Sequence, residues 1–210
     1  VFLYGNPGGG GGGDTRNKTR DRALQEFAAR HGFGIAGVTW FPGRTVYAET
    51  GDIILRTFEQ WGDMGFHPEL RHVPFITLGS SNAGVTAFAM ACRAPERVIC
   101  FTPNVGPRYG NAELSPEVML VPGLMHVGPT DTFFRSGVED TRELFENVRP
   151  QGARWCWDAE QDKGHAIGGI DDVDMKYYED IIPMRLPADA DGHRGPFKLR
   201  TIPEEDGWLV

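Results

Sequence analysis

The chain has 210 residues, 40% of them hydrophobic and 24% charged, which fits one globular domain with a single sizeable core. Lys and Arg number 21 against 29 Asp and Glu, and the resulting formal charge of −8 argues against nucleic acid or anionic lipid as the main partner. No apolar run approaches the length that spans a bilayer, so no membrane partner is expected either.

Short apolar strands and amphipathic helices alternate along the chain. The predicted strands are, in chain order, Val1–Tyr4, Gly34–Trp40, Pro74–Leu78, Val98–Thr102, Gly123–Val127 and Arg154–Trp157. The predicted helices between them are Lys18–Arg30, Asp52–Gly62, Asn82–Arg93 and Val138–Val148. Because each parallel strand needs a crossover connection, this alternation predicts an α/β fold, with a mostly parallel sheet of about six or more strands flanked by helices.

A polar tail follows the last of these elements. From Pro187 onward the chain is rich in Pro, Gly, Asp and Arg, and we expect it to wrap over the surface with Trp208 as a packing anchor. The expected organisation is therefore one domain over residues 1–186 and an extension over 187–210. The three cysteines lack metal-ligand spacing and are interpreted as buried free thiols: Cys92, Cys100 and Cys156.

The strongest chemical signal is residues 78–84, directly after the third predicted strand. A serine nucleophile on a sharp strand-to-helix turn adopts a strained conformation, so the residues two before and two after it must be small. Gly79 and Ala83 meet this requirement around Ser81, whereas Ser80 would place larger residues at both positions. Ser81 is therefore the predicted nucleophile, although Gly and Ser also punctuate ordinary strand-to-helix loops.

Two further candidates follow later strands. Asp131 closes the turn after the fifth predicted strand, and His165 lies in a glycine-flanked loop after the sixth. The carboxyl ends of parallel strands lie on one edge of a sheet, so both residues can converge there with Ser81. A serine hydroxyl needs a base within reach and a third group to orient that base, the roles predicted for His165 and Asp131. The alternative acids are Asp158, Asp162 and Glu139.

The remaining histidines have no metal-like spacing, and no metal site is predicted. His126 lies within a predicted strand and is interpreted as a core histidine with satisfied hydrogen bonds. The others are interpreted as surface or structural residues: His31, His67, His72 and His193.

The order of Ser81, Asp131 and His165, each just beyond a strand, resembles the α/β-hydrolase superfamily. Within it, the chain is similar to the serine esterase branch that includes carbohydrate esterases and polyhydroxybutyrate-depolymerase-like enzymes. The resemblance covers Val1 to about Ile182. It implies a serine hydrolase that cleaves carboxylic esters through an acyl-enzyme and uses no cofactor. It also suggests small-molecule or polysaccharide ester substrates and a secreted or periplasmic location, and it leaves the oligomeric state open.

The same resemblance implies where the oxyanion hole lies. One donor is the backbone N–H of the residue after the nucleophile, here Asn82. The other comes from the loop after the first strand, where six consecutive glycines begin at Gly8. Gly8 is the preferred donor, with Asn6 and Gly9 as alternatives, and Pro7 has no N–H to donate.

The substrate cleft is predicted from residues that follow other strand ends. Arg108 with Tyr109, and Phe133 with Phe134, are expected to line it. Only a short segment separates the fourth and fifth predicted strands, which leaves little or no room for a lid. We therefore expect an open cleft that accepts bulky or polymeric esters.

Two other classes of function fit the same residues. A peptidase or a carbon–carbon-bond hydrolase would use the same three side chains on an amide or a diketone. A non-catalytic binding protein with the α/β-hydrolase fold is the other alternative, because a fold does not fix a function. Such a protein would normally have lost one of the three residues, whereas this chain has all of them.

Overall fold

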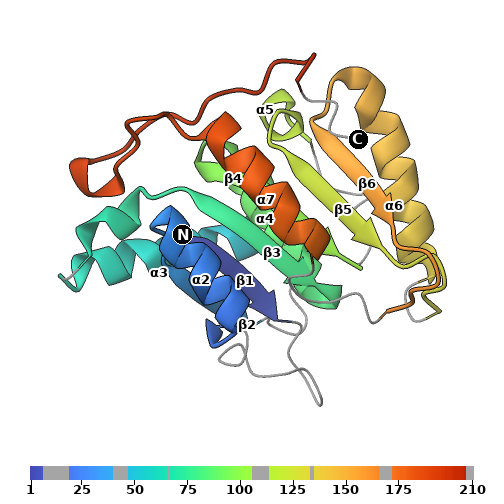
Figure 1. Ribbon diagram of the computed structural model, residues 1–210, viewed down its shortest axis with the longest axis horizontal. Helices are drawn as coiled ribbons and strands as arrows, with labels where there is room; N and C mark the ends of the chain where they lie inside the picture. The colour runs from blue at the N-terminus through green and yellow to red at the C-terminus, as the bar shows by residue number, and fades with distance from the viewer. Residues whose placement is uncertain are drawn as a thin grey trace.

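The computed structural model describes residues 1–6, 19–39, 47–65, 67–105, 114–132, 135–165 and 172–206. Across these residues the strands form one six-stranded sheet of order β2-β1-β3-β4-β5-β6, and every neighbouring pair is parallel (Figure 1). The strands are β1 (Phe2–Asn6), β2 (Ile35–Thr39), β3 (Phe75–Ser80), β4 (Val98–Asn104), β5 (Gly123–Val127) and β6 (Trp155–Ala159). The predicted α/β class and parallel sheet are confirmed.

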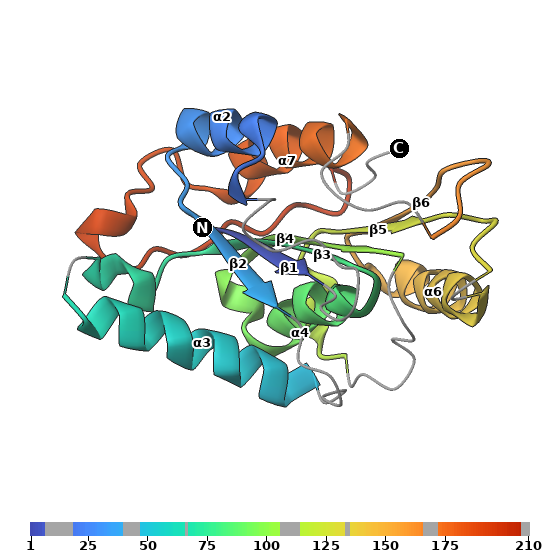
Figure 2. The ribbon, with the colours of Figure 1, turned by 90° about the horizontal axis from the view of Figure 1, so that it is seen from below.

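Helices cover both faces of the sheet. They are α2 (Arg22–His31), α3 (Tyr47–Asp63), α4 (Gly84–Arg93), α5 (Pro116–Met119), α6 (Arg135–Val148) and α7 (Asp172–Arg185). Short 3₁₀ turns connect the elements: η1 (Pro68–Arg71), η2 (Ser81–Ala83), η3 (Pro95–Arg97), η4 (Arg149–Gln151) and η5 (Gly192–Arg194). Figure 2 shows α2 and α7 on one face and α3, α4 and α6 on the other.

Side-chain alternation along the strands divides the core into two layers. Phe2 packs toward the face of α2 and α7, whereas its neighbour Leu3 packs toward the face of α3 and α4. Ile76 and Phe75 divide in the same way along β3. Both faces of the central strands are buried, as expected for a parallel sheet covered by helices on each side.

The observed ends of the helices differ from the predicted ones, and at α2 the capping residues explain the difference. Helix α2 begins at Arg22 rather than Lys18, because the Asp21 side chain accepts a hydrogen bond from the Leu24 backbone N–H and caps the helix. It ends at His31, and the following C-cap residue, Gly32, adopts φ = 66° in the left-handed region. Helices α3 and α6 each begin a few residues earlier than predicted.

Helix α7 was not predicted at all. It contains Pro183, and its sequence is acidic with no clear apolar period. Its buried residues Tyr178 and Ile181 nevertheless pack on the sheet with Leu24 and Phe27 of α2. Tertiary packing, rather than a local pattern, stabilises this helix.

The tail after α7 packs on the domain. Leu199 and Ile202 are buried, and the Arg154 side chain donates a hydrogen bond to the Ile202 carbonyl at 3.1 Å. The Arg200 backbone N–H donates to the Arg185 carbonyl at 2.8 Å. The predicted boundary at residue 186 stays a prediction, and Trp208 lies outside the described residues.

The three cysteines, all of them among the described residues, form no disulfide, and the expected burial is complete for one of them. Cys100 is buried, and Cys92 and Cys156 are half-buried. Burial raises the pKa of the Cys92 thiol to about 12. Within the described parts of the chain, none of the helices combines the length and the apolar character that crossing a bilayer requires.

Candidate active site

A sharp turn joins β3 to α4 and carries Ser81 at its first position. Ser81 has φ = 56°, a left-handed conformation that non-glycine residues adopt rarely. A Cβ atom at Gly79 would lie 1.9 Å from the Ala83 carbonyl oxygen, so the chain can fold back this tightly only with glycine at that position. Gly5 of the neighbouring β1 is also close, since its Cβ would meet the same oxygen at 3.1 Å. The packing of β1, β3 and α4 thus holds Ser81 in a strained conformation.

Ser81, His165 and Asp131 form a continuous chain of contacts. Nε2 of His165 lies 2.9 Å from Oγ of Ser81, and Nδ1 lies 2.7 Å from Oδ2 of Asp131. An ionised carboxylate can only accept, so Nδ1 donates to Asp131, and Nε2 is left to accept the proton of the Ser81 hydroxyl. The Asp131 carboxyl group is almost fully buried, with 1% of its side chain exposed, against 28% for His165. This arrangement can take a proton from Ser81 and stabilise the imidazolium that results.

The chain is similar to solved structures in its fold, whereas its sequence matches no known family. No protein-family model and no curated protein sequence matches the chain. Among solved structures, esterase PE8 is similar with a TM-score of 0.54 and 16% identity, covering 86% of this chain and 91% of that one. A point variant of SOBER1 from Arabidopsis thaliana has a TM-score of 0.52 and 15% identity, with 87% and 96% covered.

Esterase 2 of Thermogutta terrifontis, phosphoramylated by tabun, is also similar, with a TM-score of 0.50 and 15% identity over 87% of this chain and 81% of that one. The six parallel strands agree with these neighbours. The chain has the α/β-hydrolase fold. At this level of identity the likeness extends to the fold and not to the chemistry.

In this α/β-hydrolase fold the three residues come from three strand ends. Ser81 follows β3, Asp131 follows β5 and His165 follows β6, so all three lie at the carboxyl edge of the sheet. The alternative acids have other surroundings. Asp158 in β6 lies 3.3 Å from Nε2 of His126, and Asp162 and Glu139 are exposed. Of the carboxylates weighed from the sequence, Asp131 is the one found against His165.

The predicted oxyanion donors are placed only in part. Asn82 follows Ser81 directly in η2, as the prediction for its backbone N–H requires. The predicted second donor lies outside the described residues, and so do the predicted substrate-binding residues: Gly8, Arg108, Tyr109 and Phe133. Their roles stay predictions.

Sequence reasoning missed a buried polar cluster beside the site. Asn104, the last residue of β4, donates a hydrogen bond to Asp174 of α7 at 2.8 Å, and both residues are fully buried. His126 of β5 is also fully buried, and this burial is the part of its interpretation as a core histidine that the structure confirms. It lies 3.3 Å from Asp158 and 3.4 Å from Glu160. The available sequence signal for this cluster is Asn104, a polar residue at the end of an otherwise apolar strand. Its partner Asp174 lies on α7, a helix that the sequence pattern does not predict.

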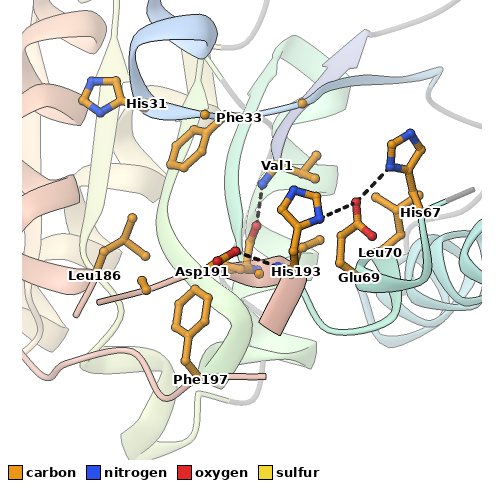
Figure 3. A pocket seen from close by; sticks show the side chains of 16 residues that line it. Val1, His31, Phe33, His67, Glu69, Leu70, Leu186, Asp191, His193 and Phe197 are labelled. Carbon is orange, nitrogen blue, oxygen red and sulfur yellow. Dashed lines mark hydrogen bonds and ion pairs between the residues drawn. The ribbon is translucent and has the colours of Figure 1, made fainter. Parts of the chain in front are cut away.

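A cavity of about 640 Å³ lies at the opposite edge of the sheet (Figure 3). Its wall includes Gly34, just before β2, and Pro74, just before β3, so it is at the amino ends of the strands. Glu69 joins two histidines there, with Oε1 at 2.9 Å from Nδ1 of His67 and 3.4 Å from Nδ1 of His193. In the described ranges, no group of His, Cys, Asp or Glu side chains has the arrangement of a metal site.

Proposed function

We propose that this protein is a serine hydrolase that cleaves carboxylic esters through an acyl-enzyme. The observation that carries the proposal is the contact chain from Oγ of Ser81 through the His165 ring to Oδ2 of Asp131, with Ser81 on a strained turn. An unassisted serine hydroxyl is a poor nucleophile, and an adjacent oriented base is what activates it. In this proposal Ser81 is the nucleophile, His165 the base and Asp131 the residue that orients the base.

The reaction proceeds in two halves. Oγ of Ser81 attacks the ester carbonyl carbon while Nε2 of His165 takes the hydroxyl proton. The tetrahedral intermediate collapses, the C–O bond to the alcohol breaks, and His165 returns that proton to the leaving alkoxide. Water then attacks the acyl carbon while His165 takes its proton, the bond from that carbon to Oγ of Ser81 breaks, and His165 returns the proton to Oγ as the carboxylic acid leaves. The buried Asp131 carboxylate stabilises the imidazolium in both halves.

The oxyanion of each tetrahedral intermediate needs donors at a fixed position. The Asn82 backbone N–H is proposed as one donor, and a residue of the loop after β1, preferably Gly8, as the other. Removing one donor from such a site costs about 3–4 kcal/mol of transition-state stabilisation. These assignments therefore matter nearly as much as the three side chains.

The proposed substrate is a neutral or weakly charged ester. The formal charge of −8 disfavours anionic substrates. Two of the similar structures are named as esterases, PE8 and the Thermogutta terrifontis protein, which supports ester chemistry. Acyl esters of polysaccharides are the finer proposal, supported by the short segment between β4 and β5, which leaves little room for a lid.

The test is hydrolysis of a short-chain p-nitrophenyl ester, together with labelling by an active-serine phosphonate located by mass spectrometry. Ser81→Ala should lower kcat by about 10⁵- to 10⁶-fold and abolish labelling. Ser80→Ala is the matched control, because it removes the adjacent serine and should leave both signals. A label at another residue would overturn the assignment of Ser81. A folded wild type with neither turnover nor label would favour a binding protein.

Substrate panels separate the remaining classes of reaction. Acylated polysaccharides, simple esters, peptides and diketones would be compared at equal concentration of the reactive bond. A higher kcat/KM on amides or diketones than on esters would replace the ester proposal with a peptidase or a carbon–carbon-bond hydrolase. A higher kcat/KM on acylated polysaccharides than on simple esters would support the finer proposal.

A further inference from the structure

The turn that carries Asp131 and the loop that carries His165 are also joined outside these two side chains. The backbone N–H of Thr130 donates to the Lys163 carbonyl at 3.0 Å. The Thr130 hydroxyl donates to the same oxygen at 2.6 Å. Thr130 directly precedes Asp131, and Lys163 lies two residues before His165. The Lys163 carbonyl therefore joins the two segments close to Asp131 and His165.

A second contact between the same two segments lies two residues before Thr130, at Gly128. A Cβ atom at Gly128 would lie 2.3 Å from the Gly164 carbonyl oxygen and 2.7 Å from that of Lys163, so the two backbones touch where a side chain would otherwise stand. The reverse substitution has room, because a Cβ at Gly164 would meet nothing nearer than the Thr130 carbonyl oxygen at 3.6 Å. Position 128 is the side of the contact that requires glycine.

The approach of the His165 loop is fixed as well. The Glu160 backbone N–H donates to the Val127 carbonyl at 3.0 Å, which anchors the loop to the end of β5. The Lys163 backbone N–H then donates to the Glu160 carbonyl at 3.2 Å, closing a turn in which Asp162 has φ = 62°. On the other side, the Asp131 backbone N–H donates to the Gly128 carbonyl at 2.9 Å. These hydrogen bonds thus hold the Lys163 carbonyl in place relative to both the turn that carries Asp131 and the loop that carries His165.

We propose that Gly128 and Thr130 are positioning residues of the reaction, which hold the His165 loop at hydrogen-bonding distance from Asp131. The inference rests on the proposed function of Ser81, His165 and Asp131. The sheet fixes only the strand ends, whereas Asp131 and His165 lie 34 residues apart on segments that extend beyond those ends. A shift of about 1 Å in such a contact is enough to lower a rate by about 100-fold.

The test compares three variants with two controls. Thr130→Val removes the hydroxyl at nearly constant shape and should lower kcat by roughly tenfold, whereas Thr130→Ser keeps the donor and should stay close to wild type. Gly128→Ala should lower kcat by about 100-fold, and KM should stay within about twofold in every variant. The controls are Thr132→Val and Gly34→Ala, which should leave kcat unchanged. Thr132 is exposed, with no hydrogen bond from its side chain to the described residues, and a Cβ at Gly34 meets nothing within 4 Å.

A second readout does not depend on turnover. The low-field proton resonance of the His165 Nδ1–H, assigned by its loss in Asp131→Asn, should disappear or broaden in Gly128→Ala and Thr130→Val and persist in Thr130→Ser and both controls. Folded Gly128→Ala and Thr130→Val proteins that keep both kcat and the resonance would overturn the proposal. So would equal losses in Thr130→Ser and Thr130→Val. A wild type that shows the resonance but hydrolyses no ester would contradict the proposed function alone.

Discussion

The two edges of the sheet are built in opposite ways. At the carboxyl edge, backbones meet without room for a side chain, at Gly79 against Ala83 and at Gly128 against Gly164. At the amino edge, a Cβ at Gly34 would meet nothing within 4 Å, and a cavity of about 640 Å³ lies beside it. The edge that carries Ser81 is thus the one at which the backbone itself fixes geometry.

This difference separates two kinds of sensitivity. Changes at the carboxyl edge displace the groups that must react, so they should lower the rate even where the fold survives. Changes beside the cavity at the amino edge, such as one at Gly34, have space to relax and lie at the other end of the strands from Ser81, so they should leave kcat unchanged. Each of the following substitutions tests this separation, from the largest effect to the smallest.

Asp131→Asn should lower kcat by about 10⁴-fold with little change in KM. The amide carries no negative charge and can donate to His165, which would hold the ring in the wrong tautomer for accepting the Ser81 proton. Asp158→Asn is the control at the same edge, because Asp158 contacts His126 instead, and it should change kcat by less than about fivefold. Equal losses in the two variants would show that the edge is sensitive to any lost carboxylate.

Gly79→Ala should lower the free energy of unfolding by about 2–3 kcal/mol and lower kcat as well. The added Cβ would lie 1.9 Å from the Ala83 carbonyl oxygen, so β3 and α4 would have to separate and Ser81 would move with them. Urea unfolding measures the first effect and ester hydrolysis the second. The same change at the amino edge, Gly34→Ala, should stay within about 0.5 kcal/mol of wild type with unchanged kcat. Comparable losses at both glycines would refute the contrast.

Much of this architecture was accessible from local sequence. All six strands lie within two residues of their predicted ends, because each is a short apolar run bounded by turn residues. The strained turn was predicted from small residues on both sides of Ser81. The meeting of Asp131 with His165 followed from the parallel-sheet rule, which needs only the strand order along the chain.

The rest depends on tertiary contacts that no local pattern reveals. Helix α7 contains an internal proline and pairs Asp174 with Asn104 of β4, so its stability comes from partners far away in sequence. The tie between Thr130 and Lys163 is likewise invisible to periodicity, since it joins two loops of irregular backbone. The sequence around Gly128 likewise carries no local signal of its contact, because only folding brings Lys163 and Gly164 beside it.

The smallest expected effect is at the amino edge, where Glu179 of α7 pairs with the end of α2. The pKa of the Glu179 carboxyl group is lowered, mainly by a hydrogen bond from Arg30 and to a smaller extent by one with His31. A carboxyl pKa that is lower in the folded state stabilises the fold above its unfolded value, and this stabilisation is lost as the pH falls through the folded pKa.

Glu179→Gln should therefore destabilise the protein by a few tenths of a kcal/mol at pH 7, an effect limited by solvent screening because 40% of the side chain is exposed. As the pH falls through the folded pKa of Glu179, the unfolding temperatures of the variant and the wild type should converge, since the wild-type carboxyl then becomes protonated. His31 also lines the cavity at the amino edge, so kcat at pH 7 should not change. A loss of kcat without a loss of stability would mean that the two edges are coupled through α7. The carboxyl and amino edges would then not differ in their effect on the rate.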